Sequence, residues 1–126
     1  MKDGKHVVLC IDDDSDLLDS VSLIIEGEGY RVETASSAEQ GLRKYRESRP
    51  DLVIVDLMME EVDAGTNFVK EVKALGGALP PIYMLSSVGD NLNLITSYSD
   101  LGLSGILQKP LDPKVLVATL KSKLRK

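Results

Sequence analysis

Five strand candidates recur along the chain, and each is followed by a stretch in which apolar residues return at helical spacing. The strand candidates are residues 7–11, 31–34, 52–55, 82–85 and 105–107. A strand followed by a helix, five times over, predicts an α/β fold with a parallel sheet. The first, third and fourth candidates are continuously apolar, which is typical of strands covered on both faces. The second alternates and is expected at an edge.

Capping residues indicate where the helices begin. Ser36 or Ser37 is expected to cap the second helix, and the last helix is expected to open with Asp112 as N-cap and Pro113 in its first turn. The apolar positions expected to face the sheet are Leu17, Leu18, Val21, Ile24 and Ile25 in the first helix, Leu42 and Tyr45 in the second, Phe68, Val72 and Leu75 in the third, Leu94, Ile95, Tyr98 and Leu101 in the fourth, and Leu116, Val117, Leu120 and Leu124 in the fifth.

Length and composition narrow the class of protein. At 126 residues the chain can bury one core, so residues 1–126 are expected to form a single domain. A net charge of −5 disfavours nonspecific contact with phosphates, so direct binding of nucleic acid is not expected. Cys10 is the only cysteine, and no apolar run approaches the roughly 20 residues of a membrane-spanning helix. We therefore expect a soluble protein of the reducing cytoplasm, with no membrane segment.

Acidic residues follow two of the predicted strands. Asp12 and Asp13 come directly after the first strand, and Asp56 follows the third. Parallel strands end at one edge of the sheet, where open α/β sheets hold their ligands, so these three carboxylates are expected to meet. Crowded carboxylates repel one another, and a divalent cation such as Mg²⁺ relieves the repulsion. Asp14 is expected instead at the start of the first helix, where a negative charge suits the helix dipole.

Two further polar residues follow the fourth and fifth strands. Ser86 would bring a hydroxyl donor to the acidic edge, and Lys109 would bring a fixed positive charge. A carboxylate nucleophile, a metal ion and donors for the remaining oxygens are what phosphoryl transfer requires. The sequence therefore predicts a site for phosphoryl chemistry.

Four motifs follow one another in an order typical of one protein family. They are the acidic pair after a strand (VLCIDD, 8–13), the acceptor motif (PDLVIVDLMM, 50–59), the hydroxyl motif (PIYMLS, 81–86) and the Lys109-Pro110 pair. Through them, essentially the whole chain resembles the response-regulator receiver domains of two-component signalling. The resemblance implies a single (βα)5 receiver domain, with a doubly wound parallel five-stranded sheet in the flavodoxin-like order 2-1-3-4-5.

The resemblance also implies a role for each acidic residue. Asp56 would accept a phosphoryl group from the phosphohistidine of a histidine kinase or phosphotransfer protein. Asp13 and Asp56 would bind Mg²⁺ directly, with the backbone carbonyl of Met58 as a further ligand. Asp12 would act on the ion largely through water.

The same resemblance gives roles to the two polar residues and to the switch. Ser86 would donate to a phosphoryl oxygen after transfer, and Lys109 would pair with the phosphate. Phosphorylation would shift the face formed by the fourth helix, fifth strand and fifth helix, where a downstream protein would dock or a homodimer would form. Two residues depart from the family pattern, because Glu60 replaces a common proline and Ile106 replaces the switch aromatic.

Two other functions are compatible with an acidic cluster. A Mg²⁺-dependent phosphohydrolase would need an acid/base carboxylate two residues after the nucleophile, where the chain has Met58. A degenerate receiver would bind a partner without phosphorylation. The leading hypothesis is a phosphoacceptor switch that is not an enzyme in the ordinary sense, since it catalyses only its own phosphotransfer and slow autodephosphorylation.

Overall fold

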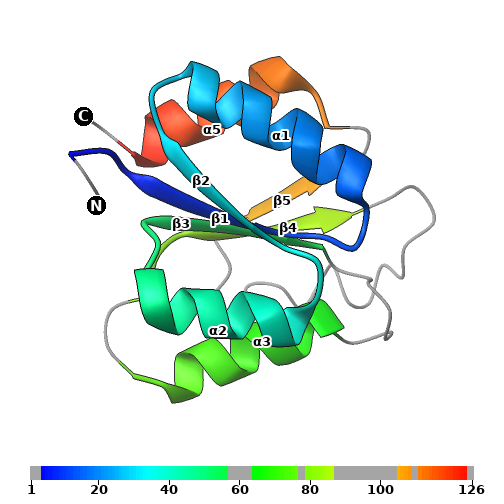
Figure 1. Ribbon diagram of the computed structural model, residues 1–126, viewed down its shortest axis with the longest axis vertical. Helices are drawn as coiled ribbons and strands as arrows, with labels where there is room; N and C mark the ends of the chain where they lie inside the picture. The colour runs from blue at the N-terminus through cyan, green and yellow to red at the C-terminus, as the bar shows by residue number, and fades with distance from the viewer. Residues whose placement is uncertain (1–3, 57–63, 77–78, 87–104, 109–110, 125–126) are drawn as a thin grey trace.

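A five-stranded parallel sheet forms the centre of the molecule (Figure 1). The computed structural model describes residues 4–56, 64–76, 79–86, 105–108 and 111–124. Its elements are β1 (Val7–Ile11), α1 (Ser15–Gly27), β2 (Arg31–Ala35), α2 (Ala38–Ser48), β3 (Leu52–Asp56), α3 (Ala64–Ala74), β4 (Ile82–Ser86), β5 (Gly105–Gln108) and α5 (Pro113–Lys123). The strand order β2-β1-β3-β4-β5 confirms the predicted α/β fold and places β2 at an edge.

The predicted strand bounds need only small corrections. β1 ends where the pattern placed it, and each of the other four strands runs one residue further than expected. The helix predicted around Leu94, Ile95, Tyr98 and Leu101 lies outside the described residues. Among the helices that are described, none is long and apolar enough to cross a membrane.

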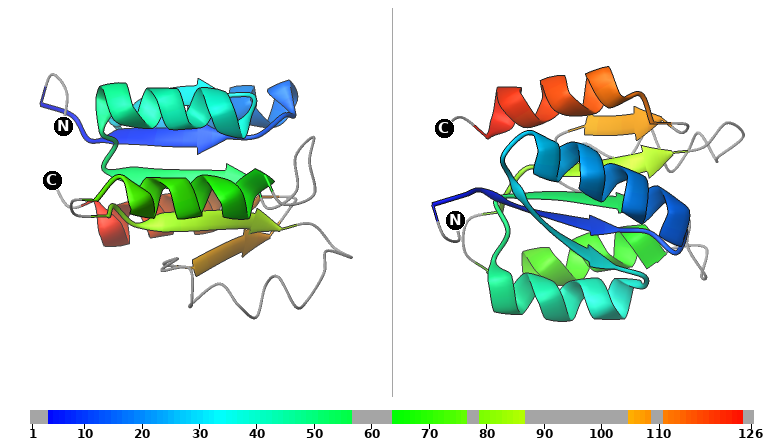
Figure 2. Two further views of the ribbon diagram at one scale, coloured as in Figure 1. Left: turned by 90° about the horizontal axis from the view of Figure 1, so that it is seen from below. Right: turned by 45° about the horizontal axis from the view of Figure 1, so that its top comes forward.

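Helices cover both faces of the sheet, α1 and α5 on one side and α2 and α3 on the other (Figures 1 and 2). Successive strand residues point to opposite faces, so each central strand contributes to two cores. In β1, Cys10 joins the core beneath α1 and α5, while Leu9 and Ile11 join the core beneath α2 and α3. Burial of every residue of β1 and β3 confirms that these strands are covered on both faces.

Side-chain caps fix where three helices begin. Asp14 caps α1, Ser37 caps α2 and Asp112 caps α5, and each accepts a backbone N–H within the first turn. Of the two serines proposed for α2, Ser37 is therefore the cap. The side chain of Gln40 instead accepts the backbone N–H of Ser36 at 2.7 Å, which ties the approach to α2 to its first turn.

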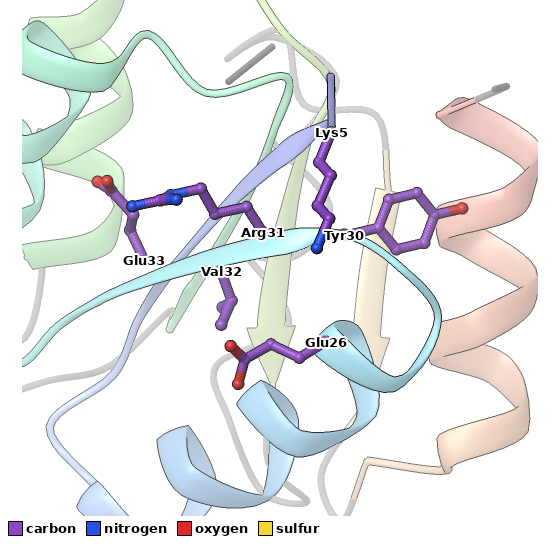
Figure 3. Close-up of a pocket in the computed structure, with 6 residues that line it drawn as sticks. All are labelled: Lys5, Glu26, Tyr30, Arg31, Val32 and Glu33. Carbon is purple, nitrogen blue, oxygen red and sulfur yellow. The ribbon is translucent and has the colours of Figure 1, made fainter. Parts of the chain in front are cut away.

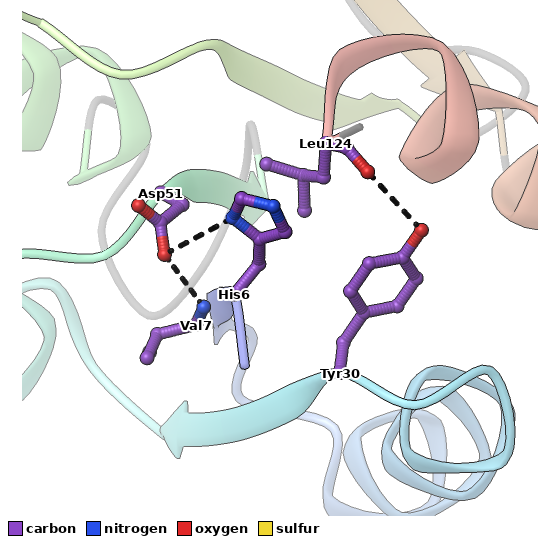
Figure 4. A network of polar contacts seen from close by, with 5 residues as sticks. All are labelled: His6, Val7, Tyr30, Asp51 and Leu124. Carbon is purple, nitrogen blue, oxygen red and sulfur yellow. Dashed lines mark hydrogen bonds and ion pairs between the residues drawn. The ribbon is translucent and has the colours of Figure 1, made fainter. Parts of the chain in front are cut away.

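A polar network joins elements at the amino ends of the central strands (Figure 4). Oδ2 of Asp51 accepts the backbone N–H of Val7 at 2.8 Å and lies 3.7 Å from Nδ1 of His6. The hydroxyl of Tyr30 donates to the carbonyl of Leu124 at 3.4 Å, joining the start of β2 to the end of α5. These contacts lie at the amino ends of the strands. Asp12 and Asp56 lie at the carboxyl ends and take no part in them.

Candidate functional site

Three acidic side chains meet at the carboxyl edge of the sheet. β1 and β3 are direct neighbours, and Ile11 pairs with Val55, so the residues that follow this pair lie side by side. One carboxylate oxygen from each of Asp12, Asp13 and Asp56 lies within 4.8 Å of the others. The meeting of these three side chains was predicted from the sequence, and the structure confirms it.

The three carboxylates differ in their exposure. Asp12 is completely buried and Asp56 is 4% exposed, whereas Asp13 is exposed to solvent. The backbone N–H of Asp12 donates to the carbonyl of Ala35 at 3.0 Å, which holds the residue at the end of β1. The cluster therefore has two fixed, buried members and one that opens it to solvent.

The end of β4 brings a candidate hydroxyl residue to the same edge. Asp56 is in register with Leu85, so the next residue, Ser86, continues β4 one residue beyond the partner of Asp56 and pairs with Gln108 of β5. The described part of Ser86 is its backbone. Three further positions lie outside the described residues: Met58 and Lys109, which are predicted site residues, and Glu60, which departs from the family pattern.

The chemistry of the cluster suits a hard divalent cation. All three candidate ligand atoms are carboxylate oxygens, the donors that Mg²⁺ and Ca²⁺ prefer over the imidazole and thiolate groups that suit softer metals. Three negative charges within 4.8 Å also repel one another unless a cation or protons compensate them. The residues present therefore fit the Mg²⁺ site that the sequence predicts.

A hollow in the surface near the start of β2 offers a contrast (Figure 3). It combines positive and negative side chains, and the positive charges of Lys5 and Arg31 would repel a metal ion. Its lining residues are Lys5, Glu26, Tyr30, Arg31, Val32 and Glu33. The acidic cluster is thus the better candidate for a metal-dependent site.

Ile106 lies in β5 in register with Met84 of β4 and is partly buried. The departure from the family aromatic is therefore a branched aliphatic side chain within the sheet.

Comparison with known proteins gives a consistent result. The family profile of the response regulator receiver domain matches residues 8–121. The DNA-binding response regulator MtrA of Mycolicibacterium paratuberculosis is 32% identical over 119 residues, which cover 94% of this chain and 51% of that protein. The chain thus spans about half the length of the curated relatives it matches.

Solved structures show the same similarity. The chemotaxis protein CheY4 of Vibrio cholerae is 32% identical, with a TM-score of 0.85 over 96% of this chain and 100% of that one. A CheY-like response regulator receiver domain protein from Methanospirillum hungatei is 28% identical, with a TM-score of 0.87 over 96% of this chain and 94% of that one. The fold, the acidic cluster and the family profile agree, and the chain belongs to the response regulator receiver domain family.

Proposed function

We propose that this chain is the phosphoacceptor switch of a two-component phosphorelay, and that Asp56 carries the phosphoryl group. The observation that carries the proposal is the meeting of Asp12, Asp13 and Asp56 at the carboxyl ends of adjacent strands. Asp56 is the last residue of β3, so the sheet holds its backbone while its carboxylate joins the cluster. A rigidly held carboxylate beside a metal site suits in-line attack on a phosphorus atom.

The donor phosphohistidine would come from a histidine kinase or a phosphotransfer protein. A carboxylate oxygen of Asp56 would form the new bond to phosphorus while the bond from phosphorus to the imidazole nitrogen breaks. Mg²⁺, when bound, would neutralise charge on the transferring oxygens. Asp13, Asp56 and the Met58 carbonyl would hold the ion, and Asp12 would act through water.

Ser86 and Lys109 complete the proposed site. The position of Ser86 at the end of β4, one residue beyond the partner of Asp56, supports a role as hydroxyl donor to a phosphoryl oxygen. Lys109 directly follows the last residue of β5, Gln108, which pairs with Ser86. The lysine would supply the positive charge that phosphate requires. Slow hydrolysis of the aspartyl phosphate by the chain itself would end the signal.

The proposed output is a change in protein binding. The segment between β4 and β5, together with β5 and α5, would form the face for a downstream protein or a second copy of the chain. Receiver domains are signalling switches rather than ordinary enzymes. We propose that residues 1–126 form a single receiver domain and that it acts in the cytoplasm. Its net charge of −5 supports a protein partner over direct contact with nucleic acid.

Intact-mass spectrometry after incubation with acetyl phosphate and Mg²⁺ tests the proposal. The wild-type chain should gain one phosphoryl group, and Asp56→Asn should gain none. Asp19→Asn, which removes an exposed carboxylate from α1, should be labelled like the wild type. If the wild-type chain stays unmodified and its amide NMR spectrum does not change when Mg²⁺ is added, the alternative is favoured: a degenerate receiver that binds a partner without phosphorylation.

A further inference from the structure

Asp14 links the start of α1 to the acidic cluster. Its backbone N–H donates to Oδ1 of Asp12 at 2.9 Å. Its own Oδ1 accepts the backbone N–H groups of Asp16 and Leu17 at 3.0 and 3.3 Å. One residue thus joins the cap of a helix to the side chain of a completely buried acid.

The cap restrains the backbone conformation that aims this N–H. Asp14 has φ −90° and ψ 104°, the extended geometry of an N-cap, and its carbonyl accepts the N–H of Leu18 at 3.1 Å. With both its side chain and its carbonyl held by α1, the N–H of Asp14 has little freedom to turn away from Asp12. The carboxylate of Asp12 is consequently oriented by the helix.

We propose that Asp14 is a positioning residue for the metal site: by capping α1 it aims its backbone N–H at Asp12 and so orients that carboxylate toward the cation. This inference rests on the proposed Mg²⁺ site. Asp14 has no ligand role in it, because its Oδ1 is engaged by the helix N–H groups and it is not one of the three acids whose carboxylate oxygens lie within 4.8 Å of one another. Groups that orient direct metal ligands are typically worth a factor of about 10 to 100 in metal affinity. Because Asp12 would act on the ion through water, we expect the effect of Asp14 at the lower end of that range.

A competing explanation is that Asp14 would act only through its charge. A negative residue close to the site attracts a cation whatever the cap geometry. Asn and Ser separate the two explanations, because both cap helices well and neither carries a charge. Asp16→Ala is the matched control, since it removes one exposed charge from the first turn of the same helix and leaves the cap in place.

Isothermal titration calorimetry of Mg²⁺ binding to the full chain tests the inference. The temperature is chosen so that circular dichroism shows every variant folded. Asp14→Ala should weaken Mg²⁺ binding about tenfold, whereas Asp14→Asn and Asp14→Ser should stay within about threefold of the wild type. Asp16→Ala should change affinity no more than Asp14→Asn does. In metal-free samples, the amide proton of residue 14 should lose exchange protection in Asp14→Ala and keep it in Asp14→Asn.

The remaining outcomes separate the two proposals. Equal weakening in Asp14→Ala and Asp14→Asn would assign the effect to charge and overturn the positioning role. Wild-type affinity in Asp14→Ala would overturn it as well. A wild-type chain that binds no Mg²⁺ would overturn the metal site itself and, with it, the role of Asp14.

Discussion

Gly41 of α2 lies so close to Ile11 of β1 that a Cβ atom at position 41 would stand 2.4 Å from Cδ1 of the isoleucine. Ile11 is completely buried and directly precedes Asp12. The absence of a side chain at position 41 therefore lets α2 lie close to the strand that carries the acidic pair. Glycine inside a helix lowers stability by about 0.5–1 kcal/mol relative to alanine. At position 41 the close approach of Ile11 is the physical reason for a glycine.

Gly41→Ala should destabilise the fold by about 1–3 kcal/mol, the usual cost of overpacking a core. Urea unfolding gives the value. Ile11→Val removes the Cδ1 atom that the new methyl group would meet, so the double variant should lose less than the sum of the two single variants. Gly27→Ala is the control, because a Cβ atom there meets nothing within 4 Å. Strict additivity of the two substitutions would contradict the contact.

Asp51→Ala should lower the free energy of unfolding by about 1–3 kcal/mol, because it leaves the partly buried N–H of Val7 without its carboxylate acceptor. Asp51→Asn keeps an acceptor oxygen and should lose less. Hydrogen exchange of the Val7 amide should accelerate in the alanine variant, alongside a lower urea midpoint. Asp19→Ala, which alters an exposed acid on α1, measures the effect of charge alone. A loss no larger than in that control would show that the bond contributes nothing.

Much of the fold could be predicted because its signals are local. A continuously apolar run such as residues 52–55 can be buried on both faces only within a central strand, and the cap at Asp112 followed by Pro113 indicates the start of α5 directly. The prediction of the acidic cluster combined the rule that parallel strands end at the same edge with the strand order implied by the family resemblance, which makes the first and third strands neighbours. Asp12, Asp13 and Asp56 therefore could be brought together before any coordinates were known.

What could not be predicted depends on pairs of residues that are distant in the sequence. The bond from Val7 to Asp51 joins residues 44 positions apart, and no local pattern marks either partner. The fit of Gly41 against Ile11 depends on the distance between a helix and a strand. Only part of the proposed role of Asp14 could be predicted. Its charge indicated the start of a helix, but nothing in the sequence indicated that its N–H would donate to Asp12.

Tyr83 should make the fold sensitive to alkaline pH. Burial raises the pKa of its phenol above the usual 10.0, so the folded chain keeps this proton at a pH where the unfolded chain has lost it. The unfolded state then binds fewer protons, and stability falls as pH rises from about 10 through the higher folded pKa. Urea midpoints measured across that range should fall less steeply in Tyr83→Phe, which keeps the ring beside Gly105. Parallel curves for the two proteins would contradict the assignment.

Neutralising Asp13 should change stability in opposite directions with and without metal. In EDTA, Asp13→Asn should unfold at a higher urea concentration than the wild type, because it removes one of three charges that lie within 4.8 Å of one another. With Mg²⁺ in excess the order should reverse, since a ligand that binds only the folded state stabilises it and the variant has lost a ligand. Asp19→Asn should follow the wild type in both buffers. If Mg²⁺ stabilised Asp13→Asn as much as the wild type, Asp13 would not be a ligand.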